Sequence, residues 1–226
     1  MWFTNPNINL EYAILKILAS LIVIFLIMPL HEFAHGFVAY KLGDYTAKYA
    51  GRLSINPLHH IDPLGAVLIL LLGIGWAKPV PIDQRNFKNP KRDTALVALA
   101  GPLSNLLAAV LGGLILNATL SFGYNLNYNF LYVAETFLSF FIMINIGLAV
   151  FNLIPIPPLD GSRILSAFLP NNVLSKYFKY ERVASIVLFV LIFIGLLNRP
   201  LSAINMNLFR WIINITALPF KTSWSL

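Results

Sequence analysis

The stretch ILKILASLIVIFLIMPLHEFAHGFVAY, residues 14–40, joins a long apolar run directly to a group of ionisable side chains. A membrane-spanning helix needs about 20 predominantly apolar residues, and comparable runs recur at 95–116 and 183–197. Of the 226 residues, 58% are hydrophobic and 11% are charged, whereas roughly 25% are charged in a typical soluble domain. The composition therefore predicts a membrane protein with several spans. It excludes a soluble enzyme, a disulfide-stapled domain and a disordered chain.

The basic residues indicate a topology. The formal net charge is +7, but Lys and Arg lie between apolar segments rather than on one water-facing surface, which argues against a nucleic-acid partner. Basic loops usually face the cytoplasm. Lys and Arg gather between residues 41 and 92 and again between 176 and 182, whereas residues 117–129 carry no charge. We expect the two basic segments to be cytoplasmic, and an uncleaved N-terminus to lie outside.

The charge pattern and the apolar runs together predict the spans. Four helices are expected to cross the membrane, at 11–40, 94–116, 131–153 and 182–198. Residues 201–220 either cross again or lie in the interface, because Arg210 interrupts them. The apolar part of 62–78 is too short to cross and has basic residues at both ends, so it is predicted to re-enter on the cytoplasmic side.

Two segments near the re-entrant stretch suggest strands. Residues 45–55 alternate between apolar and polar side chains, which is typical of a half-buried strand. The sequence KPVPI at 78–82 is expected to be extended, because each proline disfavours helix in the residue before it, and two prolines suit only an edge strand. Pro79 and Pro81 remove donors from the second segment, so the edge at 45–55 is the one to which a further extended chain could add. Alternatively, the sheet only covers neighbouring segments and binds no other chain.

The predicted fold is an all-α polytopic membrane protein with about five to six transmembrane helices, the re-entrant segment and a small cytoplasmic-side β-hairpin. The whole chain, residues 1–226, is expected to form one membrane-embedded domain. Its core covers 11–170 and its C-terminal helices cover 182–220.

The sequence HEFAH places His31, Glu32 and His35 at the cytoplasmic end of the first predicted helix. Positions i and i+4 lie on one helix face, so both imidazoles can reach one Zn²⁺ while Glu32 reaches a water beside it. The chain has no cysteine, so a metal must be held by histidine and carboxylate. The alternative is that these are ordinary polar residues at a helix end, although ionisable groups at membrane depth are usually functional.

A catalytic zinc needs a third protein ligand and an open position. The candidates are His59, His60, Glu135 and Asp160. The charge pattern places Asp160 at the depth of the HEFAH motif and Glu135 at the opposite end of its span. Prolines before Asp160 prevent a continuous helix there, and irregular backbone at this depth is tolerated where it lines a cavity. Asp160 is therefore the predicted third ligand.

Five stretches occur in an order that resembles one family. They are HEFAHG (31–36), RLSINPLHHIDPLG (52–65), GWAKPVPI (75–82), ALAGPLSN (98–105) and FNLIPIPPLDGSR (151–163). In them the chain is similar to the site-2 proteases, the intramembrane zinc metalloproteases of peptidase family M50. It resembles the compact prokaryotic form without a PDZ or CBS domain.

The resemblance implies one Zn²⁺ per chain, held by His31, His35 and Asp160, with Glu32 as the general base. Asn152 is expected to bind the substrate or the oxyanion, or else to cap a broken helix. Asn105 is expected to pack or to hydrogen-bond the active-site segment, with direct chemistry as the alternative. His60 is a possible regulatory loop ligand, or a structural residue near Asp62. Asp62 itself is expected to cap the re-entrant helix.

The implied function is hydrolysis of peptide bonds in or next to transmembrane segments of membrane-anchored proteins, in the cell (inner or plasma) membrane and near its cytoplasmic face. The alternative class is a metal-binding transporter or a non-proteolytic scaffold. Those proteins have no special need for Glu32, and transport sites commonly lie at the bilayer midplane between repeats.

Overall fold

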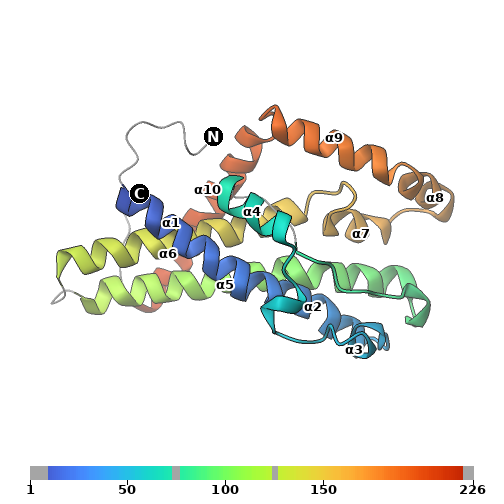
Figure 1. Ribbon diagram of the computed structural model, residues 1–226, viewed down its shortest axis with the longest axis horizontal. Helices are drawn as coiled ribbons and strands as arrows, with labels where there is room; N and C mark the ends of the chain where they lie inside the picture. The colour runs from blue at the N-terminus through green and yellow to red at the C-terminus, as the bar shows by residue number, and fades with distance from the viewer. Residues whose placement is uncertain (1–9, 73–76, 124–126, 221–226) are drawn as a thin grey trace.

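A computed structural model describes residues 10–72, 77–123 and 127–220, and within these ranges the chain is helical and contains no strand (Figure 1). The first membrane helix consists of α1 (Leu10–Ile22), a π-helical turn η2 (Val23–Ile27) and α2 (Met28–Lys41), which follow one another without a break. Pro29 in the first turn of α2 has no N–H to donate. In the π turn, Met28 N donates to Val23 O, five residues back. The predicted span at 11–40 is confirmed as a helix of spanning length.

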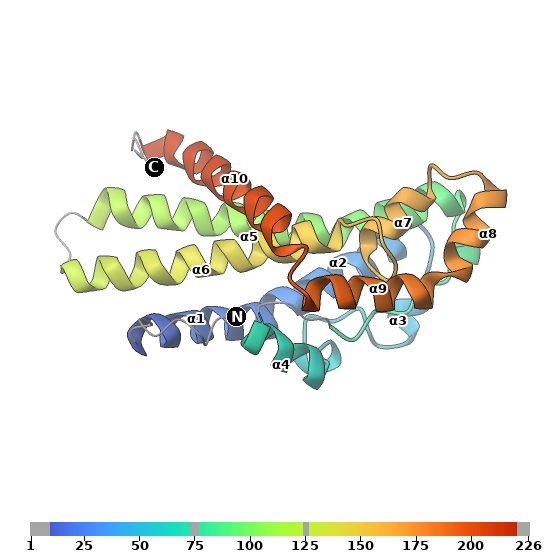
Figure 2. The ribbon, with the colours of Figure 1, turned by 90° about the horizontal axis from the view of Figure 1, so that it is seen from above.

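The long helices α5 (Pro90–Phe122) and α6 (Tyr128–Asn152) run side by side (Figure 2). Each is apolar and long enough to cross a membrane, as predicted for 94–116 and 131–153. Small residues of α5 allow close packing, since Ala109 is fully buried and Gly112 lies against Ile142. This pair is the body on which the other helices pack.

The C-terminal part of the chain corrects two predictions. It folds into the short helices α7 (Asp160–Ser166), α8 (Asn171–Lys179) and α9 (Glu181–Phe193), followed by α10 (Asn198–Ala217). The segment predicted to span at 182–198 is not one continuous helix of spanning length, because α9 has 13 residues and meets α10 at a bend of 81°. Gly195 at φ +75° ends α9 in a left-handed conformation that glycine adopts easily.

The chain therefore has three candidate spans in its described part, or four if the bent pair is one span, and the predicted count of five to six is wrong. Helix α10 covers most of 201–220 and packs against α5 and α6. Ile212 and Ile213 of α10 are buried there, and Asn117 of α5 donates its amide to Ile213 O and Thr216 Oγ1.

The predicted β-hairpin is absent from the described residues. Residues 46–49 form the short helix α3 (Thr46–Tyr49), and no ladder pairs 45–55 with 78–82. The Asp44 carboxylate replaces such a ladder: it accepts from Thr46 N (3.0 Å), Asp83 N (2.8 Å) and Asn86 Nδ2 (2.8 Å). A side chain that satisfies nearby backbone donors favours a turn or helix start over a strand, so the alternation was misleading.

Helix α4 (Pro63–Leu72) occupies the predicted re-entrant segment. Its ten residues are too few to span a bilayer. Asp62 Oδ1 accepts from Gly65 N (3.0 Å), which is the predicted cap. The fully buried Ile69 joins Val23 and Ile24 in an apolar cluster. Residues 73–76 lie outside the described part, and re-entry on one side of the membrane stays a prediction.

Candidate metal centre

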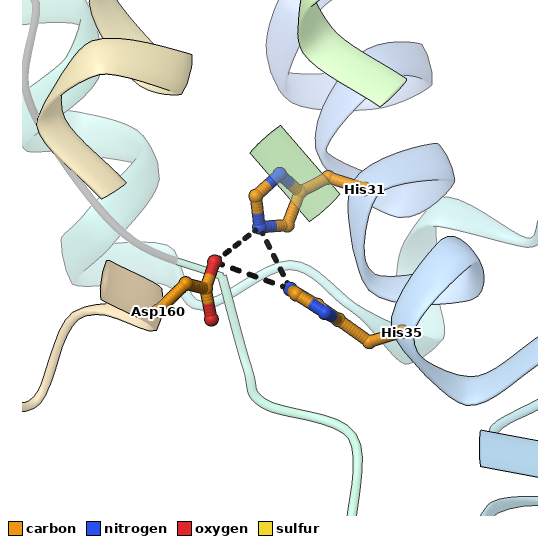
Figure 3. Close-up of side chains that lie close together, drawn as sticks. All are labelled: His31, His35 and Asp160. Atoms are coloured by element: carbon orange, nitrogen blue, oxygen red, sulfur yellow. Dashed lines mark hydrogen bonds and ion pairs between the residues drawn. The ribbon is translucent and has the colours of Figure 1, made fainter. Parts of the chain in front are cut away.

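The two histidines of HEFAH lie on adjacent turns of α2, with their Nε2 atoms 3.1 Å apart. Asp160, at the start of α7, brings its Oδ2 to 3.4 Å from His31 Nε2 and 3.3 Å from His35 Nε2 (Figure 3). Asp160, at least 125 positions after the two histidines in the sequence, thus completes a small triangle of three donor atoms. Within the described chain, these three residues form the one group of His, Asp and Glu side chains close enough to share a metal.

The triangle has the size that zinc requires. A tetrahedral zinc about 2.0–2.1 Å from nitrogen and oxygen ligands keeps those ligands about 3.3 Å from one another. The observed separations are 3.1, 3.3 and 3.4 Å. Three protein donors leave the fourth position open, as in catalytic rather than structural zinc sites. The donor set therefore fits a catalytic zinc in both chemistry and geometry.

The outer nitrogens of both rings are held from α5. His35 Nδ1 donates to Val97 O at 2.7 Å, and His31 Nδ1 donates to Asn105 Oδ1. Asn105 Nδ2 in turn donates to Asn145 Oδ1 of α6 at 3.4 Å. With the ring protons assigned to Nδ1 by these acceptors, the Nε2 lone pairs face the shared metal position. The buried asparagines thus fix the orientation of one ligand from two neighbouring helices.

Gly101 provides the space for the two rings. A Cβ atom at this position of α5 would overlap His35 Nε2, and it would lie 2.5 Å from His31 Nε2. Any other residue at position 101 would therefore displace both metal donors. The glycine in ALAGPLSN is required because the ring edges of α2 pack directly on the backbone of α5.

Asp160 reaches the site from the first residue of the short helix α7, directly after a turn, rather than from a long helix. Helix α6 ends at Asn152, and Pro155, Pro157 and Pro158 lie between that end and Asp160. Gly161 packs against the end of α6, where an added Cβ would overlap Leu153 O. The third donor is therefore placed by a proline-rich turn pressed onto the end of a long helix.

Glu32 is 9% exposed, and its Oε2 accepts a hydrogen bond from Val80 N at 3.0 Å. Pro79 and Pro81, on either side of Val80, have no N–H. In the segment predicted as an edge strand, Val80 N–H is thus the one backbone donor of the sequence Pro79-Val80-Pro81, and it binds the Glu32 carboxylate. That contact leaves Oε1 available for other partners.

The other predicted site residues lie outside the triangle. Asn152 Nδ2 donates to Leu148 O one turn back, a contact that fits the capping alternative. His60 is fully buried; its Nε2 donates to Ser54 O at 2.6 Å and its Nδ1 has no partner in the described chain. Burial lowers the pKa of His60. Neither His59 nor Glu135 belongs to the group of donor residues.

Sequence reasoning gave no role to Val97, Gly101 or Asn145. Gly101 lay within a quoted stretch, and its position four residues before Asn105 is the signal that could have suggested a site-facing glycine. Asn145 belongs to no stretch with a recognised pattern. Its role depends on α5 and α6 lying together.

The chain is similar to several proteins that are named as zinc metalloproteases. The chain is 41% identical over 181 residues to "Putative zinc metalloprotease YwhC" of Bacillus subtilis, covering 80% of this chain and 83% of that protein. It is 31% identical to "Putative zinc metalloprotease Rip2" of Mycolicibacterium smegmatis, over 75% of this chain and 64% of the relative. It is also 31% identical to "Zinc metalloprotease MJ0392" of Methanocaldococcus jannaschii, over 90% of this chain but 49% of the relative. The search of solved structures found no significant match.

The sequence model of peptidase family M50 matches residues 129–197, which include the turn that carries Asp160. Several apolar helices of spanning length accompany this match. Because the resemblance to YwhC extends over most of both proteins, and zinc is the metal that the names of these relatives share, the chain belongs to peptidase family M50, as a multi-pass membrane metalloprotease.

Proposed function

We propose that this protein is an intramembrane zinc metalloprotease of the site-2 type, which cleaves membrane-anchored proteins in or next to their spanning segments. The observation that carries the proposal is the donor triangle, two of whose residues lie on a spanning helix, with Glu32 adjacent in sequence to the first ligand. One Zn²⁺ per chain would be held by His31, His35 and Asp160. The basic segments around the motif support a site near the cytoplasmic face of the cell membrane.

Zinc held by these donors would supply Lewis-acid activation of water and of the scissile carbonyl. Glu32 then acts as the general base. Its Oε2 is held by Val80 N–H, so Oε1 takes the proton of the attacking water and returns it to the leaving amine. Asn105 and Val97 keep the two imidazoles aligned throughout. Asn152, the last residue of α6, is the proposed donor to the substrate oxyanion, and to act so its amide must exchange its bond to Leu148 O for one to the substrate.

The test is a Glu32→Gln variant, because glutamine keeps an oxygen that can accept from Val80 N–H but cannot take a proton. Zinc content should be unchanged, while cleavage should fall by about 100-fold or more. Zinc is measured on purified protein by elemental analysis. Cleavage is measured by comparing membrane-protein fragments in cells that carry the wild type or the variant.

A variant that retains both zinc and the full fragment pattern would contradict the assignment of the base. Asp160→Ala is the complementary variant, which should lose zinc as well as cleavage. Undiminished zinc in Asp160→Ala would contradict the third ligand. Zinc flux into liposomes that does not change in Glu32→Gln would instead support a transporter.

A further inference from the structure

The turn that carries Asp160 is short of backbone donors. Pro155, Pro157 and Pro158 contribute none, and the carbonyls of Pro155 and Pro157 point to partners outside the turn. Tyr177 Oη donates to Pro155 O at 2.8 Å. Ser185 Oγ lies 3.2 Å from Pro157 O and shares its hydrogen with Glu181 O at 2.8 Å. The Tyr177 hydroxyl thus binds the turn five residues before the metal donor Asp160, and the Ser185 hydroxyl binds it three residues before.

These hydroxyls come from α8 and α9, the arm at 171–193, which follows the residues that carry the family motifs. The arm leaves the helix pair and comes back over the side of α7 (Figures 1 and 2). It packs lightly: among its described side chains, Leu188 is the only buried one. Val183, Ile186 and Phe193 are each more than half exposed. An element with so few contacts to the rest of the protein moves away from it more easily than a core helix does.

We propose that Tyr177 and Ser185 are positioning residues for Asp160, and that the α8–α9 arm and metal occupancy are therefore coupled. The inference rests on the proposed zinc site but not on proteolysis. Partners in the outer shell of a metal ligand set its orientation, and their loss commonly lowers metal affinity. When the arm lies in place, the turn presents Oδ2 to both histidines. When the arm moves away, the carbonyls of Pro155 and Pro157 lose their donors and the turn relaxes.

Coupling of this kind works in both directions. If the arm favours zinc binding, zinc must favour the docked arm. Zinc should therefore slow the opening of α8 and α9, although neither helix contributes a ligand. If the contact only kept the fold intact, zinc would slow global unfolding but would leave the local opening of the arm unchanged.

The first measurement is zinc affinity of the purified full chain in detergent, by competition with a chelator. Tyr177→Phe should weaken zinc binding by about tenfold, near the lower end for outer-shell partners. Ser185→Ala should have a smaller effect because its hydroxyl is shared, and Ser185→Thr should restore affinity. The controls are Tyr180→Phe, an exposed tyrosine at the junction of α8 and α9, and Ser202→Ala, whose hydroxyl bonds within α10.

The second measurement is hydrogen exchange of the amides at 171–193 with and without zinc. In the wild type zinc should slow this exchange, and in the Tyr177→Phe/Ser185→Ala double variant the effect should be much reduced. Unchanged zinc affinity in the double variant would overturn the proposal. It would do so even if the melting temperature of the zinc-free protein fell, because the two hydroxyls would then contribute to stability alone. A wild type that binds no zinc would overturn the metal site and this inference together. Whether Glu32→Gln loses cleavage affects neither the zinc affinity nor the hydrogen exchange, so the proposed function and this inference are tested separately.

Discussion

The two sides of the donor triangle are built differently. The histidine side belongs to the helical core, where both rings lie against the Gly101 backbone and their Nδ1 atoms are held by buried acceptors. The aspartate side is a proline-rich turn, which depends on hydroxyls from a mostly exposed arm. A catalytic centre can thus combine a rigid ligand pair with a third ligand that is more easily displaced. We expect substitutions on the histidine side to have the larger effects.

The largest effect is expected for Gly101→Ala. Its Cβ would overlap the metal-facing nitrogens, and neither α2 nor α5 can move away without opening the core. Zinc binding should be abolished, and stability should fall by roughly 1–3 kcal/mol, as for other overpacked cores. Elemental analysis and thermal unfolding measure the two effects. The control is Gly147→Ala, where the nearest atom lies at an ordinary 3.6 Å. Zinc retained in Gly101→Ala would show that the histidine side is not rigid.

A smaller effect is expected for Asn105→Leu, which removes the acceptor of His31 Nδ1. The buried ring N–H would lose its partner, and zinc affinity should drop by about 10- to 100-fold. Asn105→Asp keeps an acceptor oxygen and should lose less. The matched control is Asn152→Ala, which should leave zinc affinity unchanged because Asn152 bonds within α6. If Asn105→Leu weakened zinc less than Tyr177→Phe, the order of the two sides would be reversed.

The smallest effect is expected for Asp44, whose carboxylate fastens the segment that leads from Val80 to the loop at 83–86. Burial alone would raise the pKa of Asp44, but hydrogen bonds from Thr46, Asn86 and Asp83 N lower it below its usual value. A carboxyl group with a lowered folded pKa contributes stability at neutral pH, and this is lost as the pH falls below about 4.

Asp44→Asn should therefore be modestly less stable than the wild type at pH 7, and the difference should shrink as the pH approaches 3. The difference in stability is measured by thermal unfolding of both proteins across this pH range. A loss of zinc at low pH that affects both proteins equally does not change this difference. Zinc affinity at pH 7 should be the same in both. A constant difference from pH 7 to pH 3 would contradict the role of the charged carboxylate.

The local parts of the site could be predicted because they depend on neighbours in sequence. His31 and His35 share a helix face through the i, i+4 spacing, and the paucity of charge identified the apolar helix that carries them. Asp160 could be proposed from topology, since the charge pattern placed both ends of the site at one depth. The prediction of a strand at 45–55 was wrong. The alternation of apolar and polar residues contains no information on the hydrogen bond that the Asp44 side chain accepts from the nearby backbone, and this bond favours a helix start.

By itself, the sequence determined that this is a membrane protein, because composition is a property of the chain alone. It also determined that the histidines and carboxylates could bind zinc, because the helical spacing of the histidines is local. Tertiary structure alone decided what orients those donors. Gly101 matters because α2 lies on α5, Asn145 because α6 lies beside α5, and Tyr177 because the arm returns over the turn. Each of these roles joins residues that are at least 22 positions apart in the sequence. No local pattern records such contacts, since they arise only when separate helices pack.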